Sequence, residues 1–417
     1  MHLDACGLDF GTSNSTVGYS RPGQPALLTL EGDKSTLPSV IFFHAEDLHA
    51  SYGRAAVADY LSGHEGRLMR SLKSLLGTSL MDATTEIAGQ ALPFRQLLEQ
   101  FIGELKRRAE QAAGQAFNRA VLGRPVFFVD DNPEADQLAE KTLQDIAHAV
   151  GFKEVAFQFE PIAAAFDYES QISREELVLV VDIGGGTSDF SLVRLSPERA
   201  SKTDRREDIL ANGGVHIGGT DFDKTLSLAS VMPMLGMGSA LVSGRQMPSA
   251  QFFNLATWHT INFAYTRKSW VDIQDMHRHA LDKDKLARLM RVVQQRSGHW
   301  LALQVEAAKM ALTDLATTTI ELGRIEPGQS FTMMRADFDQ AIGQLVCGIE
   351  KTVQALLRNA GVRAADIDTV FFTGGSSGVP LLRARIAALL PDARHAQGDV
   401  FGSIGAGLAL DAKRKFG

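Results

Sequence analysis

The feature that most constrains the fold of this 417-residue chain is a strand-turn-strand motif that occurs twice. Near the N-terminus a short apolar start leads into the polar turn Asp9–Asn14, and the pattern of a strand resumes over Thr16–Tyr19. The apolar run Leu177–Val181 leads in the same way into Asp182–Asp189, and Phe190–Val193 alternates as a return strand. In both copies Asp-x-Gly ends a strand and a Thr follows within a few residues. Two copies predict a duplicated α/β fold with two related halves.

The segments around these motifs are expected to alternate between helix and strand, as they do in α/β folds. Apolar side chains recur at helical spacing in three stretches, residues 96–117, 132–151 and 286–313. Continuous apolar runs predict buried strands at residues 120–122, 126–129, 155–157 and 370–373. Residues 196–208 are rich in charge and poor in apolar side chains, so we expect a solvated hairpin loop there.

Length and composition favour a globular protein with two lobes. Single cores stop growing near roughly 250–300 residues, so a chain of 417 residues predicts two domains or one domain with two lobes. Hydrophobic residues make up 45% of the chain and charged residues 22%, as in ordinary globular proteins. The net charge of −7 provides no basic field for a nucleic acid backbone, so we expect no nucleic acid partner.

The cysteines and the N-terminus bear on the cellular compartment. Cys6 and Cys347 are too few for a framework of several disulfides, and neither belongs to a C-x-x-C pair that would indicate zinc. Residues 1–6 lack the features of a secretory signal, and no stretch reaches the ~18–20 apolar residues of a membrane helix. We therefore expect a cytoplasmic protein without a membrane partner.

The glycine-rich turn Gly184–Thr187 has the composition of a phosphate-binding loop. Consecutive backbone N–H groups can converge on an anion there because glycine has no Cβ in the way. A tight hairpin that uses glycine for positive φ is the alternative. A carboxylate beside a phosphate is repelled unless a cation lies between them, so Asp9 and Asp182 are the pair we expect around Mg²⁺.

A second group of polar residues has helical spacing. Glu306, Lys309 and Thr313 fall at positions i, i+3 and i+7, so they project from one face of a helix. A solvated Glu–Lys pair is the simpler interpretation of this face in the absence of other context.

These motifs together resemble the nucleotide-binding domain of DnaK-like chaperones, the heat shock protein 70 family within the actin-like ATPase superfamily. The resemblance extends over nearly the whole chain. Gly7–Ser15 and Asp182–Asp189 resemble the family's two phosphate loops, and Glu160–Ala165, Leu72–Gly77 and Gly218–Asp223 resemble three further segments. The resemblance implies an α/β fold of the duplicated, ribonuclease H-like kind, with two lobes flanking a nucleotide cleft.

The resemblance also implies the site residues. ATP or ADP with Mg²⁺ would be the cofactors, and K⁺ is a further candidate. The residues with implied catalytic roles are Lys73, Glu160, Asp182, Thr187 and Asp189. Those implied at the metal are Asp9, Asp182 and Glu160. Those implied to bind the nucleotide are Gly11, Thr12, Ser13, Asn14, Gly184, Gly185, Gly186, Gly218, Gly219, Glu306, Lys309, Thr313, Gly374, Gly375, Ser376 and Asp399.

The chain departs from the family at three places. Met310 and Gly378 stand where the family has arginines near the adenine, so a planar stacking surface is missing. Pro125 matches the proline of the family's interlobe relay, but Glu140 and Lys141 occupy the region where its partner arginine is expected. We also expect no peptide-binding β-domain after the ATPase module, which would resemble the shortened chaperone-like proteins of bacteria.

The predicted domains are lobe I over residues 1–175, with a smaller subdomain near 38–95, and lobe II over residues 176–417, with one near 226–300. The function we expect is a chaperone-like ATPase that acts as a nucleotide-driven switch on an unidentified protein partner or client. A small-molecule kinase of the same fold and an actin-like filament protein are the alternatives. The first would need a polar substrate cleft, and the second would assemble with ATP.

Overall fold

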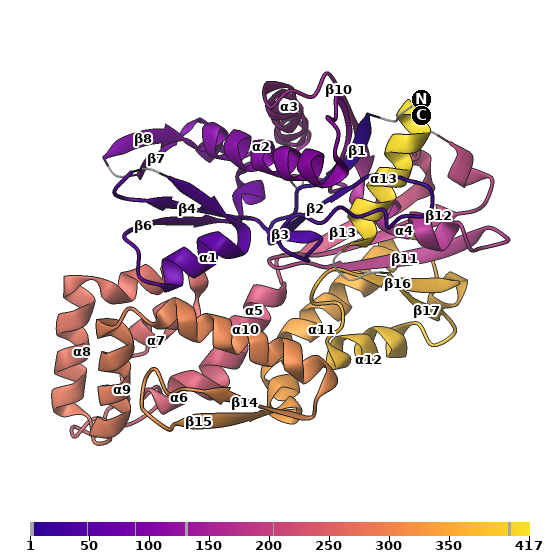
Figure 1. Ribbon diagram of the computed structural model, residues 1–417. Coiled ribbons are helices and arrows are strands. Elements are labelled where there is room, and N and C mark those ends of the chain that lie inside the picture. Colours follow the sequence, from indigo (N-terminus) through magenta and orange to yellow (C-terminus); the bar gives the residue numbers. More distant parts are fainter. Residues whose placement is uncertain (1–3, 48, 88, 130–131, 203, 399–401) are drawn as a thin grey trace. The chain divides into compact units, whose positions relative to one another are not determined.

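The computed structural model describes residues 4–47, 49–87, 89–129, 132–202, 204–398 and 402–417 (Figure 1). The chain forms two compact units. Unit 1 comprises Met1–Gly214, Val353–Ser377 and Leu389–Gly417, and unit 2 comprises Val215–Thr352 and Gly378–Ala388. The fold is α/β, as the sequence predicted.

Unit 1 contains two five-stranded sheets built on the same plan. In the first, with strand order β10-β9-β1-β2-β3, β1 (Ala5–Asp9) pairs antiparallel with β2 (Asn14–Gly18) and parallel with β9 (Arg119–Arg124). In the second, with order β13-β12-β11-β16-β17, β11 (Glu176–Ile183) has the equivalent neighbours β12 and β16. The predicted duplication is therefore confirmed. The remaining strands of the two sheets are β3 (Thr36–Pro38), β10 (Glu154–Phe159), β12 (Ser188–Leu195), β13 (Ile209–Val215), β16 (Thr369–Thr373) and β17 (Arg394–Gln397).

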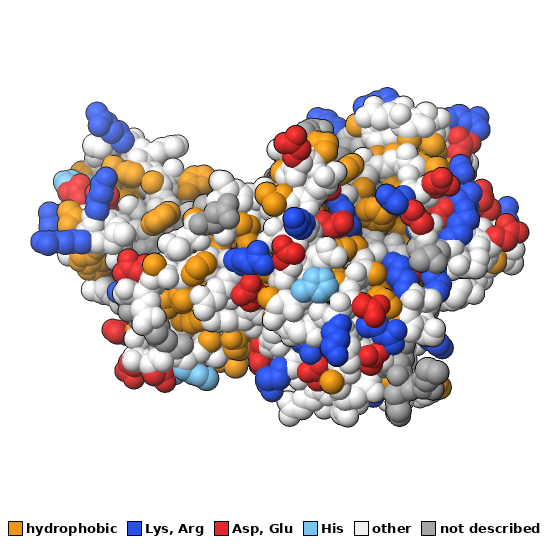
Figure 2. Space-filling view, turned by 90° about the horizontal axis from the view of Figure 1, so that it is seen from above, with side chains coloured by type: hydrophobic (Ala, Val, Ile, Leu, Met, Phe, Trp, Pro, Cys, Tyr) orange, Lys and Arg blue, Asp and Glu red, His pale blue; other side chains and the backbone are white. Residues whose placement is uncertain are grey.

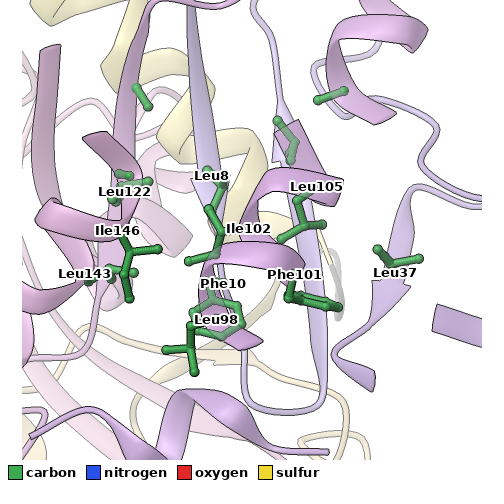
Figure 3. Close-up of a cluster of buried hydrophobic side chains, with 14 of the residues drawn as sticks. Leu8, Phe10, Leu37, Leu98, Phe101, Ile102, Leu105, Leu122, Leu143 and Ile146 are labelled. Atoms are coloured by element: carbon green, nitrogen blue, oxygen red, sulfur yellow. The ribbon is translucent and has the colours of Figure 1, made fainter. Parts of the chain in front are cut away.

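Helices pack on the first sheet through a continuous apolar core. Figure 3 shows side chains of α2 (Phe94–Ala113) directed toward Leu8 of β1 and toward Phe10, which follows the end of this strand. Side chains of α3 (Pro133–Ala149) join the same cluster. Each fully buried Leu or Phe contributes about 1.5–3 kcal/mol, so this cluster holds the strand that ends in Asp9.

The C-terminal helix α13 (Ser403–Phe416) lies directly on β1 and β2. A Cβ atom on Gly7 would fall 2.3 Å from the backbone nitrogen of Ala409, and one on Gly405 would fall 2.2 Å from Thr16 Oγ1. Such an approach is possible only without side chains at these positions.

Unit 1 also carries smaller elements. A three-stranded sheet has the order β5-β4-β6, with α1 (Gly53–Leu61) packed on it. The short elements of this unit are β4 (Val40–His44), β5 (Ala50–Tyr52), β6 (Gly66–Arg70), β7 (Thr84–Ile87), β8 (Gln90–Pro93), α4 (Glu160–Glu169) and the 3₁₀ turns Leu72–Leu75, Ser79–Asp82, Arg199–Ser201, Arg206–Asp208 and Ala364–Asp366.

Unit 2 is mainly helical. Its hairpin of β14 (Thr317–Glu321) and β15 (Ser330–Met334) precedes α11 (Arg335–Ala360), most of which belongs to this unit. The other elements are α5 (Gly219–Leu226), the π-helical turn Ser227–Val231, α6 (Met232–Met234), α7 (Ala250–Ala256), the 3₁₀ segment Trp258–Tyr265, α8 (Arg267–His279), α9 (Lys283–Gln294), α10 (Gly298–Asp314) and α12 (Pro380–Leu389).

The helical stretch predicted over residues 286–313 is two helices. Arg296 has a φ of 49°, a left-handed conformation that ends α9. The backbone N–H of Gly298 then donates to the Tyr265 hydroxyl at 2.8 Å, so the chain restarts as α10 against this side chain.

The strand predicted over residues 126–129 is absent, and β9 ends at Arg124. Pro125 has no N–H to offer a sheet, and the N–H of Phe128 donates to the carboxylate of Asp136 instead. Phe127 is 52% exposed, so this apolar run is not a buried strand.

The segment predicted as a solvated hairpin loop, residues 196–208, does connect the neighbouring strands β12 and β13, and most of its described residues are exposed or half-buried, but three of them are not solvated. Ser196, Arg205 and Asp208 are buried, and Arg205 forms a bidentate ion pair with Glu169 of α4. A charged segment can be buried when its charges are paired, which composition alone does not show.

The surface carries both signs of charge. On the face shown in Figure 2, Lys and Arg side chains lie among Asp and Glu side chains. Among the described residues, no helix is long and apolar enough to cross a bilayer.

Candidate functional site

Four charged side chains meet in unit 1. Asp9 and Asp182 stand at the carboxyl ends of the equivalent strands β1 and β11, and Glu160 begins α4. Lys73, on the turn Leu72–Leu75, donates through Nζ to Glu160 Oε1 at 2.5 Å. Their side chains are only 11% and 13% exposed, so this ion pair is largely shielded from water.

The carboxylates of this group outnumber its single cation. Burial raises the pKa of Asp9 to about 7, and the nearby charge of Glu160 adds to the effect. Burial also raises the pKa of Asp182 to about 8, with Asp189 as the next cause. Burial opposes the charge of Lys73, but Glu160 and Asp9 raise the pKa of Lys73 overall. An additional cation would relieve the repulsion among these carboxylates.

The carboxylates of Asp9, Asp182 and Glu160 fit a metal ion that keeps its bound water better than one that they contact directly. As they stand, the described His, Cys, Asp and Glu side chains include no group of three arranged to hold a metal ion. Mg²⁺ usually keeps several waters and is bound through one or two carboxylates together with phosphate oxygens. Asp9, Asp182 and Glu160 therefore fit a Mg²⁺ ion that is held largely through its water shell.

The two glycine-containing turns lie against each other in unit 1. A Cβ on Gly185 would fall 2.0 Å from Ser13 Oγ, and a Cβ on Gly11 would fall 2.0 Å from the carbonyl oxygen of Asn14. Gly184 N–H donates to Thr187 O at 2.9 Å and closes the second turn. The structure thus brings together the two copies of the motif, including Thr12 and Gly186 within them.

Ser39 braces the first turn and was not predicted from the sequence. Its hydroxyl donates to Gly11 O at 2.7 Å, and its backbone N–H donates to Ser13 O at 2.9 Å. The Ser39 hydroxyl also lies 2.9 Å from Ser15 Oγ. A lone serine ahead of an apolar strand gives no sequence signal for such a role.

The turn after β16 approaches Asp182. Gly374 has a φ of +83°, and a Cβ there would fall 2.3 Å from Asp182 Oδ1. The N–H of Ser376, beyond Gly375, donates to Ile183 O at 3.0 Å. This turn therefore supports the loop that begins with Asp182.

Two polar side chains at the end of the second motif, Asp182–Asp189, are hydrogen-bonded to each other. Thr187 Oγ1 donates to Asp189 Oδ2 at 2.8 Å. Asp189 Oδ1 lies 3.0 Å from the position that a Cβ on Gly214 would occupy, so Gly214 leaves room for this carboxylate.

A second candidate cluster lies in unit 2, on α5 and α10. Lys309 Nζ lies 2.9 Å from Asp223 Oδ1 and 3.0 Å from Asp223 Oδ2, and it also donates to Gly219 O at 3.3 Å. Lys309 is buried, so it is not half of a solvated pair with Glu306. Asp221 accepts from the N–H of Gly218 at 3.0 Å and caps α5.

Met310 and Gly378, which stand where the family has arginines near the adenine, also belong to unit 2. Met310 is 54% exposed. A Cβ on Gly378 would fall 3.2 Å from Thr313 Cγ2, so Gly378 lies beside Thr313. Asp399, the remaining predicted residue, lies outside the described residues.

Arg124 occupies the region around Pro125. It donates through Nε to Pro125 O at 3.0 Å, through Nη2 to Asp136 at 2.8 Å, and through Nη1 to Glu140. The sequence prediction singled out Glu140 but missed Arg124, because the arginine precedes the proline rather than lying on the next helix.

Comparisons with known proteins place the whole chain in relation to one family. A family model described as Hsp70 protein matches residues 5–231 and 277–406. Similar curated proteins include a chaperone protein HscA homolog of Shewanella amazonensis, 25% identical over 438 residues, and one of Pasteurella multocida, 27% identical over 408 residues. The alignments cover 99% and 93% of this chain but 58% and 54% of the relatives. The chain thus spans little more than half the length of the curated relatives it matches.

Proposed function

The chain belongs to the Hsp70 family, and from this premise we propose that it binds ATP and ADP with Mg²⁺ and hydrolyses ATP. In this proposal it acts as a chaperone-like, nucleotide-driven switch on a protein partner or client. The observation that carries the proposal is the shielded Lys73–Glu160 pair beside Asp9 and Asp182, next to two touching glycine turns.

Each group in unit 1 has a proposed role. Bound Mg²⁺ would neutralise charge on the phosphate oxygens. Asp9, Asp182 and Glu160 would hold the ion, and the N–H groups of the two glycine turns would bind the phosphates. Lys73 would stabilise charge that develops on the transferred phosphoryl group. Thr187 and Asp189, joined by their hydrogen bond, would orient the attacking water.

For unit 2 we propose Gly218, Gly219, Glu306, Lys309 and Thr313 as nucleoside-binding residues. For unit 1 we propose Gly374, Gly375 and Ser376 as nucleotide-binding residues. Because Asp223 already neutralises Lys309, we propose that Lys309 offers the nucleoside a hydrogen-bond donor rather than a free charge. K⁺ remains a candidate second cation.

Addition of Mg²⁺ and ATP is expected to raise the thermal unfolding midpoint. A ligand that binds only the native state stabilises it by about 2.7 kcal/mol at a concentration 100 times its Kd. A thermal melt with and without millimolar Mg²⁺-ATP measures the effect, with Mg²⁺ alone as the control. A folded sample whose midpoint does not move would contradict nucleotide binding.

Asp182→Asn is expected to preserve the fold and to weaken nucleotide binding mainly when Mg²⁺ is present. The substitution removes one of the carboxylates proposed to hold the ion, while the similar size of asparagine preserves the contact with Gly374. The ratio of ATP affinities with and without Mg²⁺ is the quantity to compare. An equal ratio in wild type and variant would remove Asp182 from the metal site.

A further inference from the structure

Ser39 connects two sheets of unit 1 and lies against the turn between β1 and β2. It stands between β3 and β4, and the strands on both sides of it are held in sheets. β3 pairs with β2, which follows the turn, and β4 pairs with both β5 and β6. Ser39 is only 1% exposed. It is therefore a fixed point beside the first of the two glycine-containing turns.

The hydroxyl of Ser39 takes part in a chain of two hydrogen bonds. It donates to Gly11 O at 2.7 Å and lies 2.9 Å from Ser15 Oγ. A serine hydroxyl carries one hydrogen, and Ser39 uses it for Gly11, so Ser15 is the donor in the second bond. Both serines are buried, and hydrogen bonds that are linked in this way strengthen each other away from water.

The carbonyls that accept from Ser39 fix the direction of two backbone N–H groups in the turn. Besides the bond to Gly11 O, the backbone N–H of Ser39 donates to Ser13 O at 2.9 Å. Every peptide bond among the described residues is trans, and the C=O and N–H of one trans peptide point in opposite directions. Because both carbonyls point toward Ser39, the N–H groups of Thr12 and Asn14 point away from it.

We propose that Ser39 is a positioning residue for phosphate binding, an inference that rests on the nucleotide binding proposed above. Ser39 acts through Gly11 and Ser13, and the groups that it directs toward the phosphates are the N–H groups of Thr12 and Asn14. Backbone N–H groups on one side of a turn form a concave site for an anion. A turn that is fixed before the ligand arrives loses less freedom on binding, so the support of Ser39 contributes to affinity.

The backbone bond of Ser39 also holds the residue that meets the second turn. A Cβ on Gly185 would fall 2.0 Å from Ser13 Oγ, so the Ser13 side chain lies directly against Gly185. The N–H of residue 39 remains when serine is replaced by alanine, so Ser39→Ala keeps the bond to Ser13 O. The substitution removes the bond to Gly11 O and thereby frees the peptide that carries the N–H of Thr12.

Calorimetric titration of the full chain with Mg²⁺-ADP tests the proposal. We expect Ser39→Ala to raise the Kd roughly tenfold, about the effect of one net hydrogen bond, and to leave the stoichiometry unchanged. A merely structural role would lower the folded fraction, and with it the stoichiometry, but not the Kd. Ser269→Ala is the matched control, because it also removes a buried serine hydroxyl, which donates to Gln251 Oε1 at 2.6 Å in unit 2. Its Kd should equal that of wild type.

Steady-state hydrolysis of ATP provides a second measurement. The N–H groups that Ser39 directs contact phosphate in the ground state and in the transition state alike, so Ser39→Ala should raise KM and change kcat little. Ser39→Cys has nearly the same size but only a weak donor, and it replaces the alanine variant if that variant does not fold. We expect its Kd also to exceed that of wild type.

The outcomes separate this inference from the function on which it rests. A wild type that binds Mg²⁺-ADP, together with a folded Ser39 variant of equal Kd, would overturn the positioning role and leave nucleotide binding intact. An equal rise of the Kd in Ser269→Ala would also overturn it, because the effect would then follow from the loss of any buried hydroxyl. A folded wild type that does not bind Mg²⁺-ADP would overturn both.

Discussion

Arg205→Ala is expected to lower the free energy of unfolding by about 3–5 kcal/mol, because it breaks a buried ion pair by removing one partner. Arg205 donates through Nη1 and Nη2 to the two carboxylate oxygens of Glu169, at 2.8 and 2.7 Å, and through Nε to Asp208. The side chain of Arg205 is 0% exposed, and those of Glu169 and Asp208 are each 1% exposed.

The substitution leaves two carboxylates buried with fewer partners. Glu169 keeps the backbone N–H of Ser196 at 3.1 Å, and Asp208 keeps its ion pair with Arg199. The loss also removes the guanidinium from the face of Phe166, where its central carbon lies 5.6 Å from the ring centroid. Arg205→Lys retains the charge but not the bidentate geometry, so we expect it to be less destabilising than alanine.

Arg206→Ala is the matched control for this experiment. Arg206 is adjacent in sequence and also forms an ion pair, with Asp204 at 2.9 Å, but its side chain is 75% exposed. Exposed pairs contribute about 0–1 kcal/mol. Urea unfolding of the two variants compares a buried arginine with an exposed one in the same segment. Equal losses of stability would mean that the ion pairs of Arg205 do not hold this segment in place.

The segment around Arg205 also shows which features cannot be predicted from the sequence. The duplicated motif around Asp9 and Asp182 was predictable because each copy is local: an apolar strand, a polar turn and a return strand within a few residues. Arg205 and Glu169 are 36 positions apart, and no periodic pattern connects them. From composition alone, a charged segment that is paired and buried looks the same as one that is solvated.

The candidate site likewise contains residues that local sequence patterns predicted and residues that only tertiary contacts reveal. The acidic residues and glycines of the two turns were predicted because their types imply phosphate and cation chemistry at short range. The ion pair between Lys309 and Asp223 spans 86 positions and was not predicted, although the sequence placed Lys309 on the correct helical face. Ser39 and Arg124 were missed because a single serine or arginine acquires its role only through tertiary contacts.

Lys73→Ala is expected to lower the rate of ATP hydrolysis by a factor on the order of 10²–10³, the range found when one preorganised donor is removed from a transition-state site. The nucleotide affinity should change far less. An interaction made mainly in the transition state lowers kcat when it is lost, whereas a ground-state contact lowers affinity.

The surroundings of Lys73 support this separation. Lys73 donates a hydrogen bond to Glu160, and the negative charges of Asp9 and Asp182 also raise the pKa of Lys73. Removal of Lys73 leaves these three carboxylates in place, with more negative charge to attract a cation. The groups proposed to bind Mg²⁺-ATP in the ground state therefore remain, while the cation proposed to stabilise the transferred phosphoryl group is lost.

Lys106→Ala is the matched control, because Lys106 forms an ion pair of the same length, 2.5 Å, with Glu110 on α2, and its side chain is similarly shielded at 14% exposure. Single-turnover hydrolysis and equilibrium ATP binding, measured on both variants and wild type, separate the two roles. A Lys73 variant that hydrolyses ATP at the wild-type rate would exclude this lysine from the reaction. A variant that loses binding while the bound nucleotide still turns over normally would make Lys73 a phosphate anchor, with transition-state stabilisation left to the glycine turns.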